Sequence, residues 1–396
     1  MRPTAHQSWR ITAVALNNKT REKGYIDYNL IFIILLLIGF GLLMVYSTSS
    51  YEASMSTLLK NDPGYYFKKQ LRASIMGIGA MTLVSFIPYH FWEKFGLIAY
   101  GVAMFLVVLV LTPLGYEANG ARRWLNLGIS VQPAEIAKVA MILFLAGFVT
   151  AMGNSIKTNK GFWVVLLSPG FMCLAVWLIT DNMSSAIIIF AIALIMLFVA
   201  SNEYKKFVIF GAIAAVGTAA LVLLIKLTEG SDVFGFRGAR IRAWLDPEAY
   251  ASTYSFQTTQ ALYAIGSGGV FGKGIGQSTQ KLGFLPEAQN DMIFSIICEE
   301  LGVFGGVCII ALFLLLLWRL LIIAMNAPDL YGSLIVVGVM GHIAVQVILN
   351  IAVVTGVIPN TGISLPFISY GGSSVMFLLI EFGLVTSVSK SIIFEN

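Results

Sequence analysis

Charged residues are scarce in this chain: Asp, Glu, Lys and Arg make up only 11% of its 396 residues, against about 25% in a soluble domain. Hydrophobic residues make up 58%, against about 45–50% in soluble domains. One globular core cannot bury that excess, so an ordinary water-soluble protein is excluded. A lipid solvent explains both departures.

Cysteine and histidine are also rare. The three cysteines lie in apolar runs without CxxC spacing, and the three histidines form no cluster. This pattern argues against a disulfide framework and against a zinc site. We expect Cys173, Cys298 and Cys308 to serve as small hydrophobic side chains.

Long apolar runs, by contrast, are abundant. A membrane-spanning helix needs about 20 apolar residues, so the sequence predicts an all-α polytopic membrane protein with a bundle of about ten transmembrane helices. We expect one integral domain over 27–396, preceded by a polar, basic tail over 1–26. The first span is too long for a signal-peptide core and is expected to be retained. The predicted spans fall near 27–47, 71–89, 95–113, 134–152, 162–180, 183–201, 206–227, 291–318, 331–355 and 367–390.

Basic residues in short loops set the predicted orientation. They accumulate on the side of the N-terminus, and an even number of spans returns the C-terminus to that side. We therefore expect both termini in the cytoplasm and two long connections outside, at about 113–133 and 228–290. The glycine-rich segment 228–290 is too long for a simple connector, and we expect it to form short amphipathic helices at the interface.

The predicted outer side is unexpectedly basic. Its arginines and lysines are either ordinary charges, solvated in the loops or in contact with anionic lipid, or a site for a large anionic ligand. Long loops escape the bias of basic residues toward the cytoplasm, so the orientation stands. These residues are Arg122, Arg123, Arg237, Arg240, Arg242, Lys273 and Lys281.

The segment before the fourth span combines a helix start with opposite charges. Pro133 suits the first turn of a helix, and Glu135 suits its positive N-terminus. Glu135 and Lys138 are three residues apart and share a helix face. They form either an ordinary ion pair at a span end or, with Arg123, a site for an anionic head group.

Three carboxylates accompany the eighth span. Asp291 directly precedes the apolar run, where a carboxylate is costly and a functional candidate, although a helix cap is the alternative. Glu299 and Glu300 lie deeper. Adjacent residues point in different directions, so at least one should face the interior, with a partner such as His342 or a backbone group. We interpret these two glutamates as structural rather than functional.

Polar residues also mark the last two spans. His342, Gln346 and Asn350 are spaced by four and form one stripe, which should face other helices or a cavity. The segment 365–374 carries glycines and hydroxyls that permit close helix approach or irregular backbone along a cavity.

These residues together resemble the SEDS family of bacterial membrane proteins, represented by FtsW, RodA and SpoVE. Gln289-Asn290 stands where the family commonly has His-Thr, and Asp181-Asn182-Met183-Ser184-Ser185 replaces a Pro-Asp-Leu-Gly-Thr-like stretch. The stretch 276–281 favours the FtsW and SpoVE branch. The resemblance rests on Gly-Ala-Arg-Arg-Trp-Leu at 120–125, Gln-Pro-Ala-Glu-Ile-Ala-Lys at 132–138, Ala-Ile-Gly-Ser-Gly-Gly at 264–269, Gly-Ile-Gly at 274–276, Leu-Pro-Glu-Ala-Gln-Asn-Asp at 285–291 and Ile-Ser-Leu-Pro-Phe-Ile-Ser-Tyr-Gly-Gly-Ser-Ser at 363–374.

The resemblance implies ten transmembrane helices and a peptidoglycan glycosyltransferase that polymerises lipid II on the outer face of the bacterial cytoplasmic membrane, during cell division or cell-wall synthesis. It implies a class B penicillin-binding protein, a transpeptidase, as partner, beside other divisome or elongasome membrane proteins and no nucleic acid. The family's essential aspartate falls on Asp291, our candidate general base. Substrate binding is expected at Arg123, Glu135, Lys138, Arg240, Arg242, Lys281, Glu287, Ser369, Gly371, Gly372 and Ser373.

The resemblance also suggests a divalent cation, Mg²⁺ or Mn²⁺, which would be held loosely because the sequence shows no protein metal site. Two rival functions remain. Ten spans and intramembrane carboxylates also fit a flippase that transports lipid II. A division scaffold is the third interpretation, but it leaves the outer basic residues unexplained.

Overall fold

The computed structural model describes residues 26–118, 120–126, 128, 130–201, 203–228 and 235–392. The predicted N-terminal tail therefore lies outside the described residues, apart from Ile26. Within the described part, helices dominate and the chain is a multi-pass, all-α membrane protein, as predicted.

All ten predicted spans appear as helices. Eight of those in the described part are long and apolar enough to cross a membrane. The two others are α5, with only 14 residues, and α3, whose first turns carry Lys68, Lys69 and Arg72. The ten are α2 (Tyr28–Met55), α3 (Tyr65–Phe86), α5 (Gly96–Leu109), α6 (Pro133–Met152), α7 (Asn159–Thr180), α8 (Met183–Ser201), α9 (Tyr204–Leu227), α12 (Ile293–Met325), α13 (Leu330–Val354) and α14 (Gly372–Lys390).

A small antiparallel sheet occupies the first long connection. Its strands are β1 (Gly115–Ala118), β2 (Ala121–Asn126) and β3 (Ser130–Val131), in the order β1-β2-β3. The sequence did not predict it, because strands of two to six residues are too short for a clear alternation of apolar and polar residues. Shorter helical turns are η1 (Thr57–Leu59), α4 (His90–Glu93) and η2 (Gly153–Lys157).

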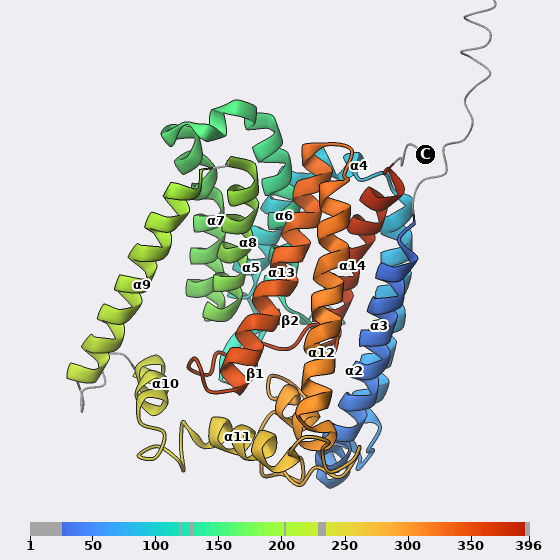
Figure 1. Cartoon of the computed structure of the whole chain (residues 1–396), viewed down its shortest axis with the longest axis vertical. Helices are drawn as coiled ribbons and strands as arrows, with labels where there is room; N and C mark the ends of the chain where they lie inside the picture. Colours follow the sequence, from blue (N-terminus) through green and yellow to red (C-terminus); the bar gives the residue numbers. More distant parts are fainter. Residues whose placement is uncertain are drawn as a thin grey trace, which may run out of the picture.

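The second long connection contains α10 (Gly235–Leu245) and α11 (Phe256–Gly268), which confirms the prediction of short helices there. Figure 1 shows β1, β2, α10 and α11 at one end of the bundle, and α4 and the C-terminal end at the other. We call these the outer end and the inner end, after the predicted orientation. Both long connections thus meet at the outer end.

The helices differ greatly in how deeply they are buried. α13 lies inside the bundle and buries most of its residues. α9 is the opposite case: Ile225 is its only buried residue within the described range, and the helix stands apart from the others (Figure 1). Close packing elsewhere depends on glycine, because a Cβ on Gly383 of α14 would lie 2.8 Å from the carbonyl oxygen of Met81 on α3.

Candidate active site

Asp291 lies at the outer end, in the turn that leads into α12. Only 7% of the surface of Asp291 is exposed. Glu287 adopts a left-handed φ of 56°, and its carbonyl accepts the amide of Asn290 at 2.9 Å, which reverses the chain. The alternative prediction of a helix cap is wrong: Met292 precedes the first helical residue, and no side chain caps this helix.

Two helices and an irregular segment hold Asp291 in place. Gln257 of α11 donates to its Oδ1 at 3.4 Å, and Asn350 of α13 donates to its main-chain carbonyl at 2.7 Å. Ser369 donates to the neighbouring carbonyl of Asn290 at 2.6 Å. The stripe predicted on α13 therefore does face the interior, where Gln346 also donates to the carbonyl of Ser364.

Arg240 of α10 connects to Asp291 through a chain of amides. Its guanidinium donates to the carbonyl of Asn360 at 2.9 Å, and the Asn360 side chain donates to Gln257 Oε1 at 2.7 Å. Burial lowers the pKa of Arg240, the negative charge of Asp291 opposes that shift, and the positive charge of Arg123 adds to it. Arg240 therefore interacts electrostatically with both Asp291 and Arg123.

The surroundings of Asp291 favour its protonated form. Burial, together with the negative charge of Glu287, raises the pKa of Asp291 from 3.8 to about 7, although Arg240 and the hydrogen bond from Gln257 oppose the shift. A carboxyl group that titrates near neutrality can accept a proton and release it again, which is what a general base requires.

Arg122 and Arg123 are neighbours on β2 but have different roles. Arg122 donates to the main-chain carbonyls of Thr112 and Gly115, and so joins β2 to the start of β1 and to the segment before it. Arg123 is half-buried, and its buried Nε has no hydrogen-bond partner within the described part. Burial lowers the pKa of Arg123, and the charge of Asp181 opposes the shift. Arg123 thus retains donors for an anion.

Glu135 and Lys138 form the predicted pair on one face of α6. The Lys138 Nζ lies 2.9 Å from Glu135 Oε1, and both residues are buried. α6 begins at Pro133, with Glu135 in its first turn, as the sequence predicted. The remaining oxygen, Glu135 Oε2, has no partner among the residues that the structure describes.

Lys281 makes structural contacts in this structure, and its role in substrate binding stays a prediction. Its buried ammonium donates to Glu300 at 2.7 Å and to Ser47 of α2 at 2.9 Å. Glu299 likewise pairs with Lys273 at 2.7 Å. The two glutamates thus fix the loop 269–281 against α12 and α2.

His342 is not the partner of these glutamates, since it pairs with Glu381 of α14 at 2.8 Å. The alternative partner, a backbone group, is confirmed for Glu299, which accepts the amide of Thr279 at 3.0 Å.

The remaining predicted residues lie in the turn, on α10 and at the start of α14. The side chain of Glu287 accepts a hydrogen bond from Asn290, and Arg242 lies on α10, two residues beyond Arg240. Gly371 donates its amide to Gln70 of α3 at 3.1 Å. Gly372 and Ser373 begin α14 after the predicted irregular backbone.

Gln257 and Asn360 were not identified from the sequence. Both are amides in ordinary surroundings, the first turn of α11 and the irregular segment after α13, and neither has an unusual local pattern. Only the fold brings these two segments beside the turn that carries Asp291. No group of three or more His, Cys, Asp or Glu that could hold a metal ion occurs in the described ranges.

The chain resembles known proteins over nearly its whole length. Residues 28–392 match the profile of the family that groups FtsW, RodA and SpoVE, described as "Cell cycle protein". Stage V sporulation protein E of Bacillus subtilis (strain 168) is 40% identical over 94% of this chain and 99% of its own. The "probable peptidoglycan glycosyltransferase FtsW" of Geobacter sp. (strain M18) is 36% identical over 93% of this chain and 98% of its own length.

Solved structures have the same fold. A chain from the work described as "Structural coordination of polymerization and crosslinking by a peptidoglycan synthase complex" superposes with a TM-score of 0.72 and 27% identity, over 92% of this chain and 97% of that one. The rod shape determining protein RodA of Thermus thermophilus superposes with a TM-score of 0.64 and 26% sequence identity, over 93% of this chain and 98% of the RodA chain.

Proposed function

Because this chain belongs to the FtsW, RodA and SpoVE family of cell cycle proteins, we propose that it is a peptidoglycan glycosyltransferase whose active site surrounds Asp291. Relatives of similar length carry that activity in their names. The observation that carries the assignment to this site is the buried Asp291, with a pKa raised to about 7, beside Arg240.

The proposed substrate is lipid II, a disaccharide-peptide on a polyprenyl diphosphate. Asp291 accepts the proton of the acceptor sugar hydroxyl while that oxygen bonds to the anomeric carbon of the donor and the bond to the diphosphate breaks. Gln257, on the hydrogen-bonded chain to Arg240, orients the carboxylate. The buried turn keeps this carboxylate at a fixed position, so little reorganisation accompanies the reaction.

Cations on neighbouring elements would stabilise the departing diphosphate. Arg123 has an unused, buried Nε, and planar guanidinium groups match phosphate oxygens. Arg240 and Lys138 are proposed to add positive charge. A divalent cation fits only as an ion shared with the substrate, since Glu287 and Asp291 supply two carboxylates; bound there, it would neutralise diphosphate charge.

The proposed setting is the outer face of the bacterial cytoplasmic membrane, with both termini in the cytoplasm. A class B penicillin-binding protein is the proposed partner, because a structural neighbour belongs to a complex that couples polymerisation to crosslinking. We place the activity in cell division or cell-wall synthesis, as the names of the relatives suggest.

The deciding experiment supplies labelled lipid II to the purified chain, with and without a class B penicillin-binding protein, and separates the glycan products by size. Polymer from the wild type and none from Asp291→Ala supports the proposal. The same substrate in sealed vesicles tests the rival, since transport across the bilayer without any polymer would identify a flippase.

A further inference from the structure

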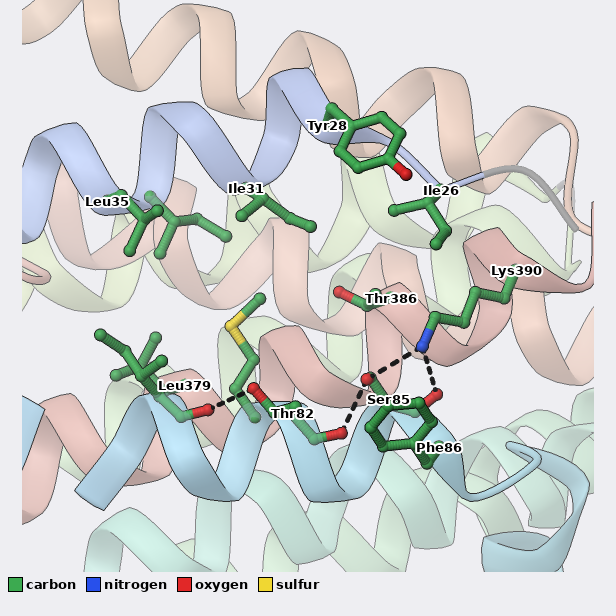
Figure 2. A pocket seen from close by; sticks show the side chains of 13 residues that line it. Ile26, Tyr28, Ile31, Leu35, Thr82, Ser85, Phe86, Leu379, Thr386 and Lys390 are labelled. Atoms are coloured by element: carbon green, nitrogen blue, oxygen red, sulfur yellow. Dashed lines mark hydrogen bonds between the residues drawn. The ribbon is translucent and has the colours of Figure 1, made fainter. Parts of the chain in front are cut away.

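A groove lies at the inner end of the bundle, far from Asp291. It has a volume of about 270 Å³ and lies among α2, α3 and α14. Ile31 and Leu35 of α2 line one side, and Thr82 of α3 lies opposite them (Figure 2). Ile78 of α3 and Leu379 of α14 also line the groove.

The groove opens sideways, toward the surroundings of the bundle. Its α14 residues Leu379 and Thr386 are buried, whereas Leu35 is 48% exposed and Phe86, at the end of α3, is 74% exposed. Since α2 and α14 are long and apolar enough to cross a membrane, the medium at this opening is lipid hydrocarbon. A narrow apolar groove of this size suits an acyl chain and is too small for a helix.

One end of the groove is polar and carries Lys390. The Nζ of Lys390 donates to the carbonyl and to the Oγ of Ser85, each at 3.1 Å, and lies 4.5 Å from the ring centre of Phe86. None of these three partners of the ammonium group carries a charge. Figure 2 shows the ammonium at the end of the groove where Thr386 and Ser85 also lie.

Two other cations toward the inner end have carboxylate partners. Arg319 pairs with Asp27 at 2.6 Å, and Lys206 pairs with Glu203 at 2.9 Å. Lys390 has no ion pair among the described residues. Its charge is therefore available to an anion that arrives with an apolar tail.

We propose that this groove is a binding site for an anionic phospholipid. One acyl chain lies between α2 and α3, and the phosphate accepts hydrogen bonds from the Lys390 ammonium. The lipid then fills the space between two helices and supplies the negative charge that the protein does not. This site is independent of the proposed glycosyltransferase chemistry, since it lies at the opposite end of the bundle.

The test uses the full chain in phosphatidylcholine vesicles that contain a few per cent of a lipid with a photoreactive acyl chain. The photoreactive lipid is phosphatidylglycerol in one arm and phosphatidylcholine in the other. After irradiation, mass spectrometry maps the labelled peptides. We expect label on the groove-lining parts of α2 and α3, with about a fivefold preference for phosphatidylglycerol, the effect of one lysine at a membrane surface.

Two variants separate the head-group contact from the groove. Lys390→Gln should abolish the preference while label remains in the groove, whereas Lys205→Gln, which removes an exposed lysine at the inner end of α9, should leave the preference unchanged. Thr82→Trp should fill the groove and remove the label from α2 and α3. Thr82 suits this change because its hydroxyl contacts only its own helix, at Ile78.

Each measurement can overturn one part of the proposal. Equal labelling by the two lipids in the wild type, or an unchanged preference in Lys390→Gln, overturns the assignment of an anionic head group. Persistent groove labelling in Thr82→Trp, or no label on α2 and α3 in the wild type, overturns the groove itself. The midpoint of thermal unfolding of each variant shows whether it is folded.

Discussion

The side-chain amide of Asn350 lies 2.7 Å from two main-chain carbonyl oxygens, that of Asp291 and that of Ile363. Asn350 is fully buried on α13. One interior amide therefore joins the turn that carries the candidate base to the irregular segment that follows α13. The position of Asp291 depends on the centre of the bundle rather than on the outer loops alone.

Asn350→Leu should therefore weaken both the fold and the activity. It leaves two buried carbonyls without their donor, at a cost of about 1–3 kcal/mol each. We expect a lower midpoint of thermal unfolding and a reduced rate of glycan polymerisation. Gln346→Leu is the matched control, since Gln346 lies on the same stripe but donates to Ser364 instead of Asp291. Full activity in Asn350→Leu would contradict the positioning role.

Asp291→Asn should abolish polymerisation of labelled lipid II, because an amide cannot accept the proton of the acceptor hydroxyl. The variant should remain folded, since Asn keeps the shape and can still bond to Gln257. Asp62→Asn is the control: Asp62 lies before α3 and pairs with Lys68 on the surface, so its loss should leave the rate unchanged. A polymerisation rate near the wild-type level in Asp291→Asn would remove Asp291 as the base.

The rate of polymerisation should depend on the ionisation of Asp291. A base must be deprotonated, and the pKa of Asp291 lies at about 7. Below that pH the rate should fall about tenfold for each pH unit, and above it the rate should level off. Initial rates measured between pH 5 and pH 9 test this. A pH-independent rate between pH 5 and pH 7 would show that another group takes the proton.

The same shift predicts how stability depends on pH. Folding raises the pKa of Asp291 from 3.8 to about 7, so the folded state binds more protons between these values, and its stability falls as pH rises through that window. Asp291→Asn removes the buried charge. Its unfolding midpoint should exceed that of the wild type most above pH 7, and the difference should shrink as pH falls toward 4.

The bundle and the candidate base could be predicted because each leaves a local signal. A run of about 20 apolar residues is enough to indicate a span, and a carboxylate against such a run is costly enough to indicate function. Asp291 satisfies the second condition directly. The sheet β1–β3 gave no signal, because its strands are too short for a period to show.

The partners of the buried charges could not be predicted, because the fold sets them over long sequence distances. Glu300 pairs with Lys281, a residue of the preceding loop, and also accepts from Ser47 of the first span. Gln257 and Asn360 lie 103 positions apart in sequence yet share a hydrogen bond. Their amides are unremarkable in sequence and acquire a role only through the positions of α11 and the segment after α13.

The pair of His342 and Glu381 offers a test of what a buried polar contact contributes inside this bundle. The two side chains are each 1% exposed and join α13 to α14 at 2.8 Å. Replacing only one partner, as in His342→Leu or Glu381→Leu, leaves the other buried and uncompensated, which typically costs about 3–5 kcal/mol.

The double variant His342→Leu with Glu381→Leu should recover most of that loss, because two apolar side chains pack without a desolvation penalty. It should also polymerise lipid II normally, since neither side chain contacts Asp291 or its supporting amides in the described structure. Thermal unfolding of the four proteins gives the coupling between the two residues. A stable double variant without activity would show that this pair takes part in function, because stability alone would then no longer explain why the chain keeps a histidine and a glutamate at these positions.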